Sequence, residues 1–264
     1  MTVKLIELKN IFYSAEDDNL SFSKKESTDI LFDVTFSVSE KEIVGICGES
    51  GGGKSTLAKL IVQIIKPTKG ELILNNKIES QKDKPNEIQI LFQNSSDLIN
   101  PYRKINTTIN EALKLAGTKK EDIEIEKNGL AGTININPAL LNRRGLGLSG
   151  GERQRIALAR LLAVKPKVLI LDEPYSAQDI TSQINFVKLL KRINEDLGIT
   201  IICISHDLKI LRNLVQRTII LKEGRIVESG TTEEVFNNPQ DSYTRFLLSA
   251  ESLKLSYDEI QSRN

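Results

Sequence analysis

The sequence has 264 residues, with 36 lysines and arginines against 35 aspartates and glutamates, and a formal net charge of +1. This length fits one large domain or a domain with a small subdomain, and it excludes a long tandem array. The balanced charge gives no electrostatic signal for a nucleic-acid partner. Two cysteines cannot cross-link a fold of this size, which favours a reducing compartment, and the single histidine excludes a histidine-cluster metal site.

No segment has the pattern of a targeting signal or of a membrane-spanning helix. The first ten residues alternate charged and apolar side chains, and they lack the apolar core of a signal peptide. No apolar run approaches the roughly 18 residues that a spanning helix needs. We therefore expect a chain that does not cross a membrane, although it could dock on a protein that does.

The first third of the chain predicts strands around one glycine-rich loop. Apolar alternation or continuous apolar runs predict strands at residues 3–11, 32–38, 42–47, 71–74 and 87–92. The polar segment 15–29 is expected to be a loop or hairpin excursion. Residues 54–65 have helical periodicity, and the Lys-Pro pair that follows marks the end of the helix.

The rest of the chain predicts a helical region followed by alternating strands and helices. Residues 94–147 lack strand signals, and with the helix that follows they predict a helical subdomain at about 94–165. Helices are then expected at 149–164, 181–197, 207–215, 231–236 and 243–249. Strands are expected at 167–171, 200–204, 218–221 and 225–229. This alternation predicts an α/β fold with a mostly parallel sheet covered on both faces.

Residues 48–56 read GESGGGKST, which satisfies the phosphate-loop pattern G-x-x-x-x-G-K-[ST]. Glycines let successive backbone N–H groups turn inward around phosphate oxygens, and the following helix directs its positive end at the anion. Lys54 would place a positive charge on the outer phosphates, and Ser55 would offer its hydroxyl to Mg²⁺. The alternative is a chance flexible glycine loop, and the strand before it and the helix after it make a chance match less frequent. The predicted phosphate-binding residues are Gly48, Glu49, Ser50, Gly51, Gly52, Gly53, Lys54, Ser55 and Thr56.

Two adjacent carboxylates follow the apolar strand at residues 167–171. In α/β proteins, ligands bind at the carboxyl ends of such strands. Asp172 suits a role at Mg²⁺, and Glu173 is placed to orient or deprotonate a water that attacks the γ-phosphate. An Asp-Glu pair alone is more often a solvated strand end, but together with a phosphate loop it indicates catalysis.

The segment LSGGE at residues 148–152, followed by RQRIALAR, resembles the signature motif of ATP-binding cassette (ABC) ATPases. Ser149 can cap a helix whose positive end exposes the N–H groups of Gly150 and Gly151, which makes a second anion site. In this family, the signature site closes over ATP held by the phosphate loop of the opposite subunit. The resemblance therefore implies a head-to-tail dimer with two ATP molecules at its interface.

Other positions match family motifs in the same order. Gln93 follows a predicted strand where the family has its Q-loop glutamine, a Mg²⁺ ligand. Residues 176–179 match the D-loop position. His206 follows the strand 200–204 and matches the switch histidine that contacts the γ-phosphate; a lone histidine elsewhere is usually structural or simply exposed. Tyr13 is the first candidate for the aromatic that stacks on adenine, while Phe12 and Phe22 compete with it, and a core or hairpin role is comparable in weight.

Within the family, the sequence is similar to the oligopeptide, dipeptide and nickel importer ATPases. The similarity rests on the phosphate loop, on residues 92–101 and on the tail, residues 230–239 and 243–248. Departures are Glu152 in place of the commoner glutamine, Gln178 in place of a D-loop leucine, and Asn-Ser after Gln93 in place of Asp-Pro. Gln178 leaves the communication across the dimer less well specified. The stretch 94–147, which is expected to touch the membrane subunit, is short and matches poorly, so the transported solute is poorly specified.

The resemblance implies a P-loop NTPase cassette with a RecA-like, mostly parallel sheet core, an antiparallel β subdomain and a small helical subdomain. We expect one domain over residues 1–247 and a tail over 248–264. The implied function is the ATPase subunit of an ABC importer for peptides or a related small solute such as nickel, peripheral on the cytoplasmic face of the membrane. The alternatives are an exporter ATPase, a non-transport ABC ATPase or a regulatory nucleotide-binding module.

The implied cofactors are ATP and Mg²⁺, and nucleic acid is not expected as a partner. Separate membrane permease subunits would form the pore, and an extracytoplasmic solute-binding protein would belong to the complex. The second ATPase subunit could be an identical chain or a paralogue. Cys47 and Cys203 lie in apolar strands, so we expect two buried small side chains and no redox pair.

Overall fold

The computed structural model describes residues 3–16, 27–75, 78, 85–93, 99–174 and 179–250. The chain divides into two compact units. The first unit combines residues 1–75 with residues 202–264, and the second comprises residues 76–201. Two distant stretches of sequence therefore form the first unit, and contacts within it join the N-terminal and C-terminal parts of the chain.

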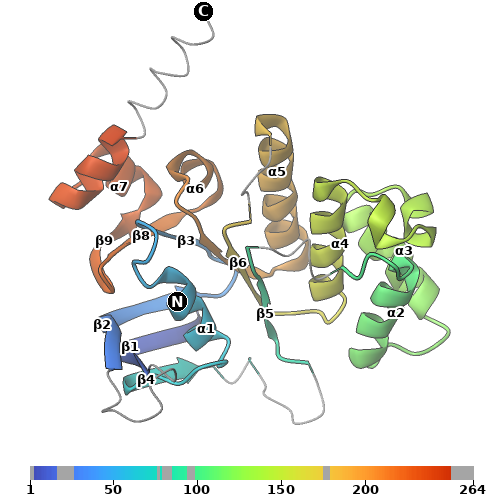
Figure 1. Cartoon of the computed structure of the whole chain (residues 1–264), viewed down its shortest axis with the longest axis horizontal. Coiled ribbons are helices and arrows are strands. Elements are labelled where there is room, and N and C mark those ends of the chain that lie inside the picture. The colour runs from blue at the N-terminus through green and yellow to red at the C-terminus, as the bar shows by residue number, and fades with distance from the viewer. Residues whose placement is uncertain are drawn as a thin grey trace, which may run out of the picture. The chain divides into compact units, whose positions relative to one another are not determined.

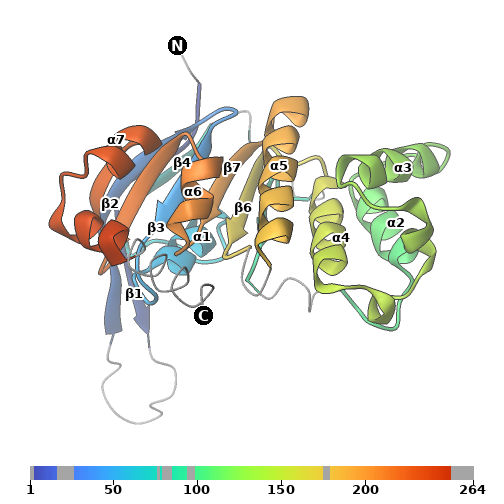
Figure 2. The same cartoon turned by 90° about the horizontal axis from the view of Figure 1, so that it is seen from above.

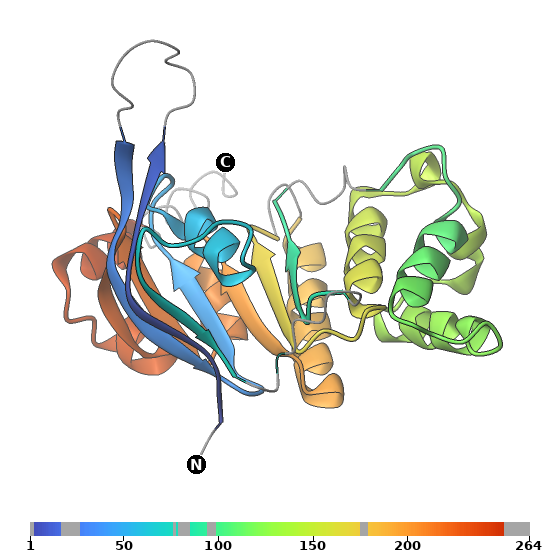
Figure 3. The same ribbon diagram turned by 90° about the horizontal axis from the view of Figure 1, so that it is seen from below.

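An antiparallel sheet of three strands belongs to the first unit, in the order β2-β1-β4. Its strands are β1 (Lys4–Glu16), β2 (Ser27–Ser39) and β4 (Lys69–Leu74). The β1–β2 pairing continues to Glu16 and Ser27, beyond the β1–β4 pairing, as Figure 3 shows. Both strands are longer than predicted, because the far end of their pairing, Ser14 to Glu16 against Ser27 to Asp29, consists of small and polar residues that carry no apolar alternation. Residues 17–26 of the expected excursion lie outside the described residues.

The first unit also contains the strand that precedes the glycine-rich loop. Strand β3 (Ile43–Cys47) pairs in parallel with β8 (Arg217–Lys222), which pairs antiparallel with β9 (Arg225–Thr231). Every residue of β3 is buried, as expected for a parallel strand covered on both faces. Helix α6 (Leu208–Leu214) packs on β3, and α7 (Thr232–Asn237) packs on β8 and β9, as Figure 2 shows.

Helix α1 (Lys54–Ile61) is four residues shorter than predicted. Gln63 has a left-handed backbone, with φ of 62°, and its N–H donates to the carbonyl of Leu60. The N–H of Ile64 donates to the carbonyl of Lys59, which completes a Schellman motif. Glycine is the usual residue at this position of the motif, and Gln63 therefore gave no stop signal in the sequence.

The second unit contains one parallel strand pair and most of the helices. Strands β5 (Ile88–Leu91) and β6 (Val168–Asp172) pair in parallel, and all of β6 is buried. Helices α2 (Ile105–Leu115), α3 (Ile123–Thr133) and α4 (Gly150–Leu162) pack together, as Figure 1 shows. Two short 3₁₀ helices (Pro138–Asn142 and Gly145–Gly147) connect α3 to α4, and α5 (Ile180–Leu197) follows β6.

Strand β7 (Thr200–Ile204) carries the chain from the second unit back to the first. Parallel pairs, one antiparallel sheet and covering helices make this an α/β protein, and the predicted fold class is confirmed. The described part of the chain includes no helix with both the length and the apolarity to cross a membrane. The domain limits 1–247 and 248–264 stay predictions, and residues 251–264 lie outside the described residues.

Candidate active site

Backbone geometry explains the glycines of the loop between β3 and α1. Gly48, Gly51 and Gly53 have positive φ angles of 151°, 81° and 93°. A Cβ on Gly48 would lie 1.9 Å from the carbonyl oxygen of Leu221, and a Cβ on Gly53 would lie 2.8 Å from the Leu31 side chain. Glycine is therefore required at Gly48 both for backbone conformation and for space, because the backbone of Leu221 cannot move aside as a side-chain end can. At Gly53 the Leu31 side chain could shift, so the positive φ is the stronger requirement.

Lys54 is buried and forms hydrogen bonds to the backbone of this loop. Its side chain is 7% exposed, and its ammonium donates to the carbonyls of Gly48 and Glu49 at 2.9 and 2.8 Å. Gly53 is the N-cap of α1, so no side chain caps the helix, and no acidic residue lies in its first turn. The loop thus combines a cation with the positive end of a helix dipole. No acidic side chain in the first turn neutralises that end. Both features favour the binding of phosphate.

His206 lies at the same sheet end as this loop. The N–H of Ser205, the residue after β7, donates to the carbonyl of Ile46 at 3.1 Å, two residues before the loop begins. Ser205 is buried, whereas the following His206 is exposed. The Ser205 hydroxyl accepts from the N–H of Asp207, which in turn caps α6. The turn after β7 is therefore fixed, and it presents His206 outward.

Tyr13 is the strand partner of a residue that touches the loop. It pairs with Leu31 across β1 and β2, at a point where the register shifts on both sides. Leu31 is the residue against Gly53. Phe12, one of its two rivals, pairs with Lys69 on the other side of β1. The second rival, Phe22, lies outside the described residues.

In the second unit, the ends of β5 and β6 bring together Gln93, Asp172 and Glu173. Leu91 and Leu171 are register partners, so Gln93 and Glu173 each lie two residues beyond the same rung of the ladder. Asp172 is 4% exposed, whereas Gln93 is exposed. Glu173 has a φ of 50°, a left-handed conformation that is uncommon outside glycine and frequent at functional sites.

The predicted signature segment forms the start of α4. Ser149 is the N-cap, and it forms a capping box with Glu152: each side chain accepts from the other residue's backbone N–H. Glutamate serves here as well as the commoner glutamine would. A Cβ on Gly150 or Gly151 would meet no atom of the described residues within 4 Å. The capping box thus leaves the N–H groups of both glycines to other acceptors.

One contact of this region was not predicted. The buried side chain of Gln154, on α4, donates to the carbonyl of Pro174, the residue after Glu173. This hydrogen bond fastens the acidic strand end to the signature helix. Gln154 belongs to the stretch RQRIALAR of the signature resemblance, but nothing in that local pattern predicts its contact with a residue 20 positions away. Residues 176–178 of the predicted D-loop lie outside the described residues, and Asp179 caps α5.

A comparison with known families decides the identity of this chain. The family described as ABC transporter matches residues 31–176, more than half of the sequence. The chain belongs to the ABC transporter family. The predicted resemblance is confirmed, and the chain is an ATPase cassette of this family that binds nucleotide.

Relatives and solved structures agree with this assignment. The dipeptide transport ATP-binding protein DppF of Haemophilus influenzae is 36% identical, over 87% of this chain and 72% of that protein. Its oligopeptide transport ATP-binding protein OppF is 34% identical, over 93% and 77%. A putative peptide import ATP-binding protein of Brucella ovis is 35% identical, over 84% and 72%.

Two solved structures show the same fold. The cassette CbiO1 of Clostridium perfringens, part of the ABC transporter complex CbiONQ, gives a TM-score of 0.78 at 27% identity, covering 89% of this chain and 92% of that one. The ATP-binding cassette MJ0796, solved as a dimer in a post-hydrolysis state with ADP and phosphate, gives 0.70 at 27% identity, covering 86% and 99%. Dimerisation and nucleotide binding therefore occur on this fold.

The ABC cassette offers a direct test of the contact between Gln154 and Pro174. We expect Gln154→Leu to lower the free energy of unfolding by about 1–3 kcal/mol, because it leaves a buried carbonyl without its donor. Asn128→Leu, at an exposed position of α3, is the control and should change it by less than about 0.5 kcal/mol. Urea denaturation of both variants measures the difference, and equal values would contradict a stabilising role for this hydrogen bond.

Proposed function

We propose that this chain is the ATP-hydrolysing subunit of an ABC importer that takes up peptides or a related small solute through a separate permease. The observation that carries this proposal is the set of relatives, which are named for dipeptide transport, oligopeptide transport and peptide import. These names do not favour a non-transport ATPase. The subunit would act at the cytoplasmic face of the membrane, together with a permease and a solute-binding protein.

ATP would bind with its phosphates in the loop 48–56. The buried ammonium of Lys54 and the open end of α1 support this role. Tyr13 would stack on adenine, and its pairing with Leu31, the residue beside Gly53, supports that assignment. The site would be completed by Ser149, Gly150 and Gly151 of a second ATPase subunit. The capping box supports that role, since it uses the N–H groups of Ser149 and Glu152 and leaves those of the two glycines to other acceptors.

Mg²⁺ would be held by oxygen atoms of Ser55, Gln93 and Asp172. Hydroxyl, amide and carboxylate oxygens are the donors that this hard cation prefers, so the residues fit the ion. Nucleotide phosphates would complete the coordination, as is usual for Mg²⁺ at nucleotide sites. When bound, Mg²⁺ neutralises charge on the phosphate oxygens.

Glu173 would orient the attacking water and accept its proton, and His206 would contact the γ-phosphate. The backbone of Glu173 supports this assignment, because its left-handed conformation turns the residue sharply at the end of a buried strand. Gln93, exposed beyond the adjacent strand, would sense the ion and relay its state to the helical region and the permease.

Replacing the buried lysine of the loop tests this proposal. We expect Lys54→Met to abolish measurable ATP hydrolysis and to weaken ATP binding at least about tenfold, because it removes the cation from the phosphates. Lys59→Met, an exposed lysine on the same helix, should behave as the parent. Phosphate release and fluorescent-nucleotide binding by the purified proteins give both quantities. Equal hydrolysis by Lys54→Met and its parent would contradict the proposed site.

The solute class needs a cellular test. In cells that carry this chain, deletion of its gene should stop growth on peptides that supply an essential amino acid, whereas growth on the free amino acid continues. The parent gene should restore growth and the Lys54→Met gene should not. Unchanged growth of the deletion strain on peptides would contradict peptide import, and the ATPase measurement would still report on the nucleotide site.

A further inference from the structure

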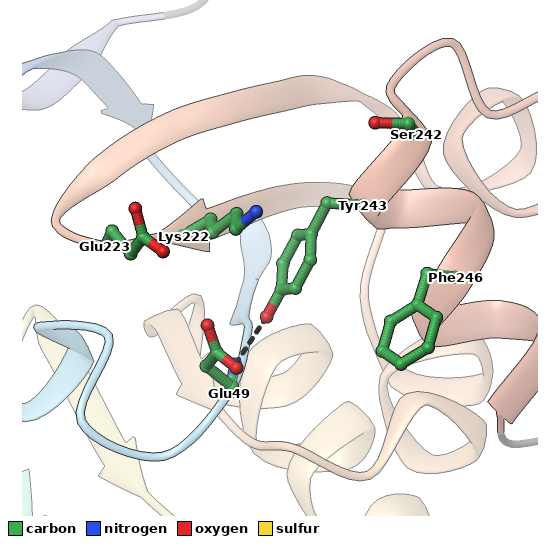
Figure 4. A pocket seen from close by; sticks show the side chains of 6 residues that line it. All are labelled: Glu49, Lys222, Glu223, Ser242, Tyr243 and Phe246. Atoms are coloured by element: carbon green, nitrogen blue, oxygen red, sulfur yellow. Dashed lines mark hydrogen bonds between the residues drawn. The ribbon is translucent and has the colours of Figure 1, made fainter.

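A hollow of about 450 Å³ lies beside the phosphate loop, within the first unit. Its lining comes from three separate parts of the sequence, and Figure 4 shows the side chains involved: Glu49, Lys222, Glu223, Ser242, Tyr243 and Phe246. Glu49 is the second residue of the loop, and Lys222 ends β8. The other lining residues include Tyr243 and Phe246, from the helical segment 242–250 near the carboxyl end of the chain.

Tyr243 connects this C-terminal segment to the phosphate loop. Its side chain points at Glu49 in Figure 4, and its hydroxyl accepts a hydrogen bond from the backbone N–H of Glu49 at 2.9 Å. Lys222 lies over its ring, with the ammonium 5.0 Å from the centroid. The residue is 8% exposed, and burial raises the pKa of its phenol, so the hydroxyl is un-ionised at neutral pH.

The segment that carries Tyr243 is itself fastened to the sheet. The carboxylate of Glu228, on β9, accepts from the N–H groups of Gln240 and Asp241 at 2.8 and 3.1 Å. Asp241 then accepts from the N–H of Tyr243 at 2.8 Å, which fixes the first turn of the helical segment. The tyrosine hydroxyl is therefore held in place by β9 through a continuous series of hydrogen bonds.

The loop also contacts the backbone of β8 and of the turn between β8 and β9. Gly48 lies against the carbonyl of Leu221, so closely that a Cβ would clash with it. The carbonyl of Gly52 accepts from the N–H of Gly224, in the turn between β8 and β9, at 3.2 Å. With the Tyr243 hydroxyl on Glu49, the first half of the loop is braced at Gly48, Glu49 and Gly52.

We propose that Tyr243 is a positioning residue for nucleotide binding, because its hydroxyl holds the Glu49 amide and so fixes the path on which the following loop N–H groups face phosphate. This inference rests on the proposed function and adds to it a contribution from the C-terminal segment. Tyr243 touches the loop backbone and is not a catalytic residue. A loop held in its binding conformation loses less conformational freedom when the nucleotide binds, and this raises affinity.

The test is Tyr243→Phe, which removes the hydroxyl and keeps the ring beneath Lys222. We expect the Kd for ADP and the KM for ATP to rise about five- to tenfold, with kcat within about twofold of the parent, since the proposed hydrolytic groups are untouched. Hydrogen exchange at the Glu49 amide should become faster, because the amide loses its acceptor. Phe246→Ala is the control: it lines the same hollow, is 64% exposed, and should leave all of these quantities unchanged.

The outcomes separate this inference from the proposed function. A parent chain that binds ADP and hydrolyses ATP, with a Tyr243→Phe variant of equal Kd and KM, would overturn the positioning role alone. A parent that neither binds ADP nor hydrolyses ATP would overturn the proposed function and this inference with it. A variant with parental Glu49 exchange would overturn the hydrogen bond on which the inference rests. Matching thermal unfolding of variant and parent shows that the change in affinity is local.

Discussion

Glu173→Gln should lower kcat for ATP hydrolysis at least about 100-fold, which is the range that loss of a general base gives. Glutamine has the same shape and the same tolerance of the backbone, so the left-handed conformation at φ 50° and the Pro174 contact with Gln154 should persist. Nucleotide affinity should stay within a few-fold of the parent, because the proposed phosphate ligands are unchanged. Phosphate release and nucleotide binding by purified protein measure both effects.

Glu195→Gln serves as the matched control for that experiment. Glu195 is exposed on α5 and belongs to neither predicted site segment, so its amide variant should hydrolyse ATP as the parent does. A Glu173→Gln protein with parental kcat would remove Glu173 from the mechanism. A variant that lost nucleotide binding together with hydrolysis would instead assign the carboxylate to binding.

Gly48→Ala should be among the most destabilising single changes in the first unit, lowering the free energy of unfolding by about 3–5 kcal/mol. The added Cβ would lie 1.9 Å from the Leu221 carbonyl oxygen, and the backbone φ of 151° is unfavourable for alanine. Neither the loop nor β8 can move aside easily, because β3 and β8 are paired in parallel up to Cys47 and Ile220. Chemical denaturation measures the loss.

Gly51→Ala separates the clash from the backbone strain. Gly51 also has a positive φ, 81°, but a Cβ there would meet no atom of the described residues within 4 Å. Its replacement should therefore cost only the left-handed conformation, about 1–2 kcal/mol. Equal losses at Gly48 and Gly51 would show that strand β8 yields, and would contradict the close approach of the loop to Leu221.

The two units divide the predicted site residues between them. The loop 48–56, Tyr13 and His206 belong to the first unit, and Gln93, Asp172, Glu173 and the signature segment belong to the second. Each group already shows local order: Ser205 joins the turn before His206 to β3, and Gln154 joins the acidic strand end to α4. The proposed chemistry therefore depends on two groups, each of which is held by contacts within its own unit.

Local sequence signals predicted much of this protein, because those signals act over a few residues. The Ser149 cap and its partner Glu152 lie three residues apart, so their capping box follows from the sequence alone. The buried strands β3, β6 and β7 were visible as apolar runs, and Cys47 and Cys203 are buried in β3 and β7 as expected. The glycine-lysine loop between a strand and a helix identified a phosphate site before any contact was known.

Local signals failed where a residue other than glycine adopts a left-handed backbone conformation. The end of α1 at a Schellman motif with Gln63, and the left-handed Glu173, use residues that rarely accept positive φ. The outer parts of β1 and β2 were missed for another reason: their pairing through Glu16 and Ser27 involves small and polar residues without apolar alternation. Backbone pairing extends the ribbon there, and the Ser14 hydroxyl donates to the carboxylate of Asp29 on the opposite strand. Strand propensity describes an isolated segment, so it does not include the pairing with a neighbouring strand that extends β1 and β2.

By itself, the sequence determined the fold class, the phosphate loop, the order of the motifs and so the family of this chain. Only the tertiary structure showed that Gly48 must be glycine for lack of space as well as for its positive φ. The residue that leaves no space, Leu221, is distant in sequence and lies beside Gly48 because β3 pairs in parallel with β8. The tertiary structure also decided that Tyr243 braces Glu49 and that Gln154 holds Pro174. Hydrogen bonds and close contacts between distant segments depend on distances in the folded chain. The local order of residue types does not specify those distances.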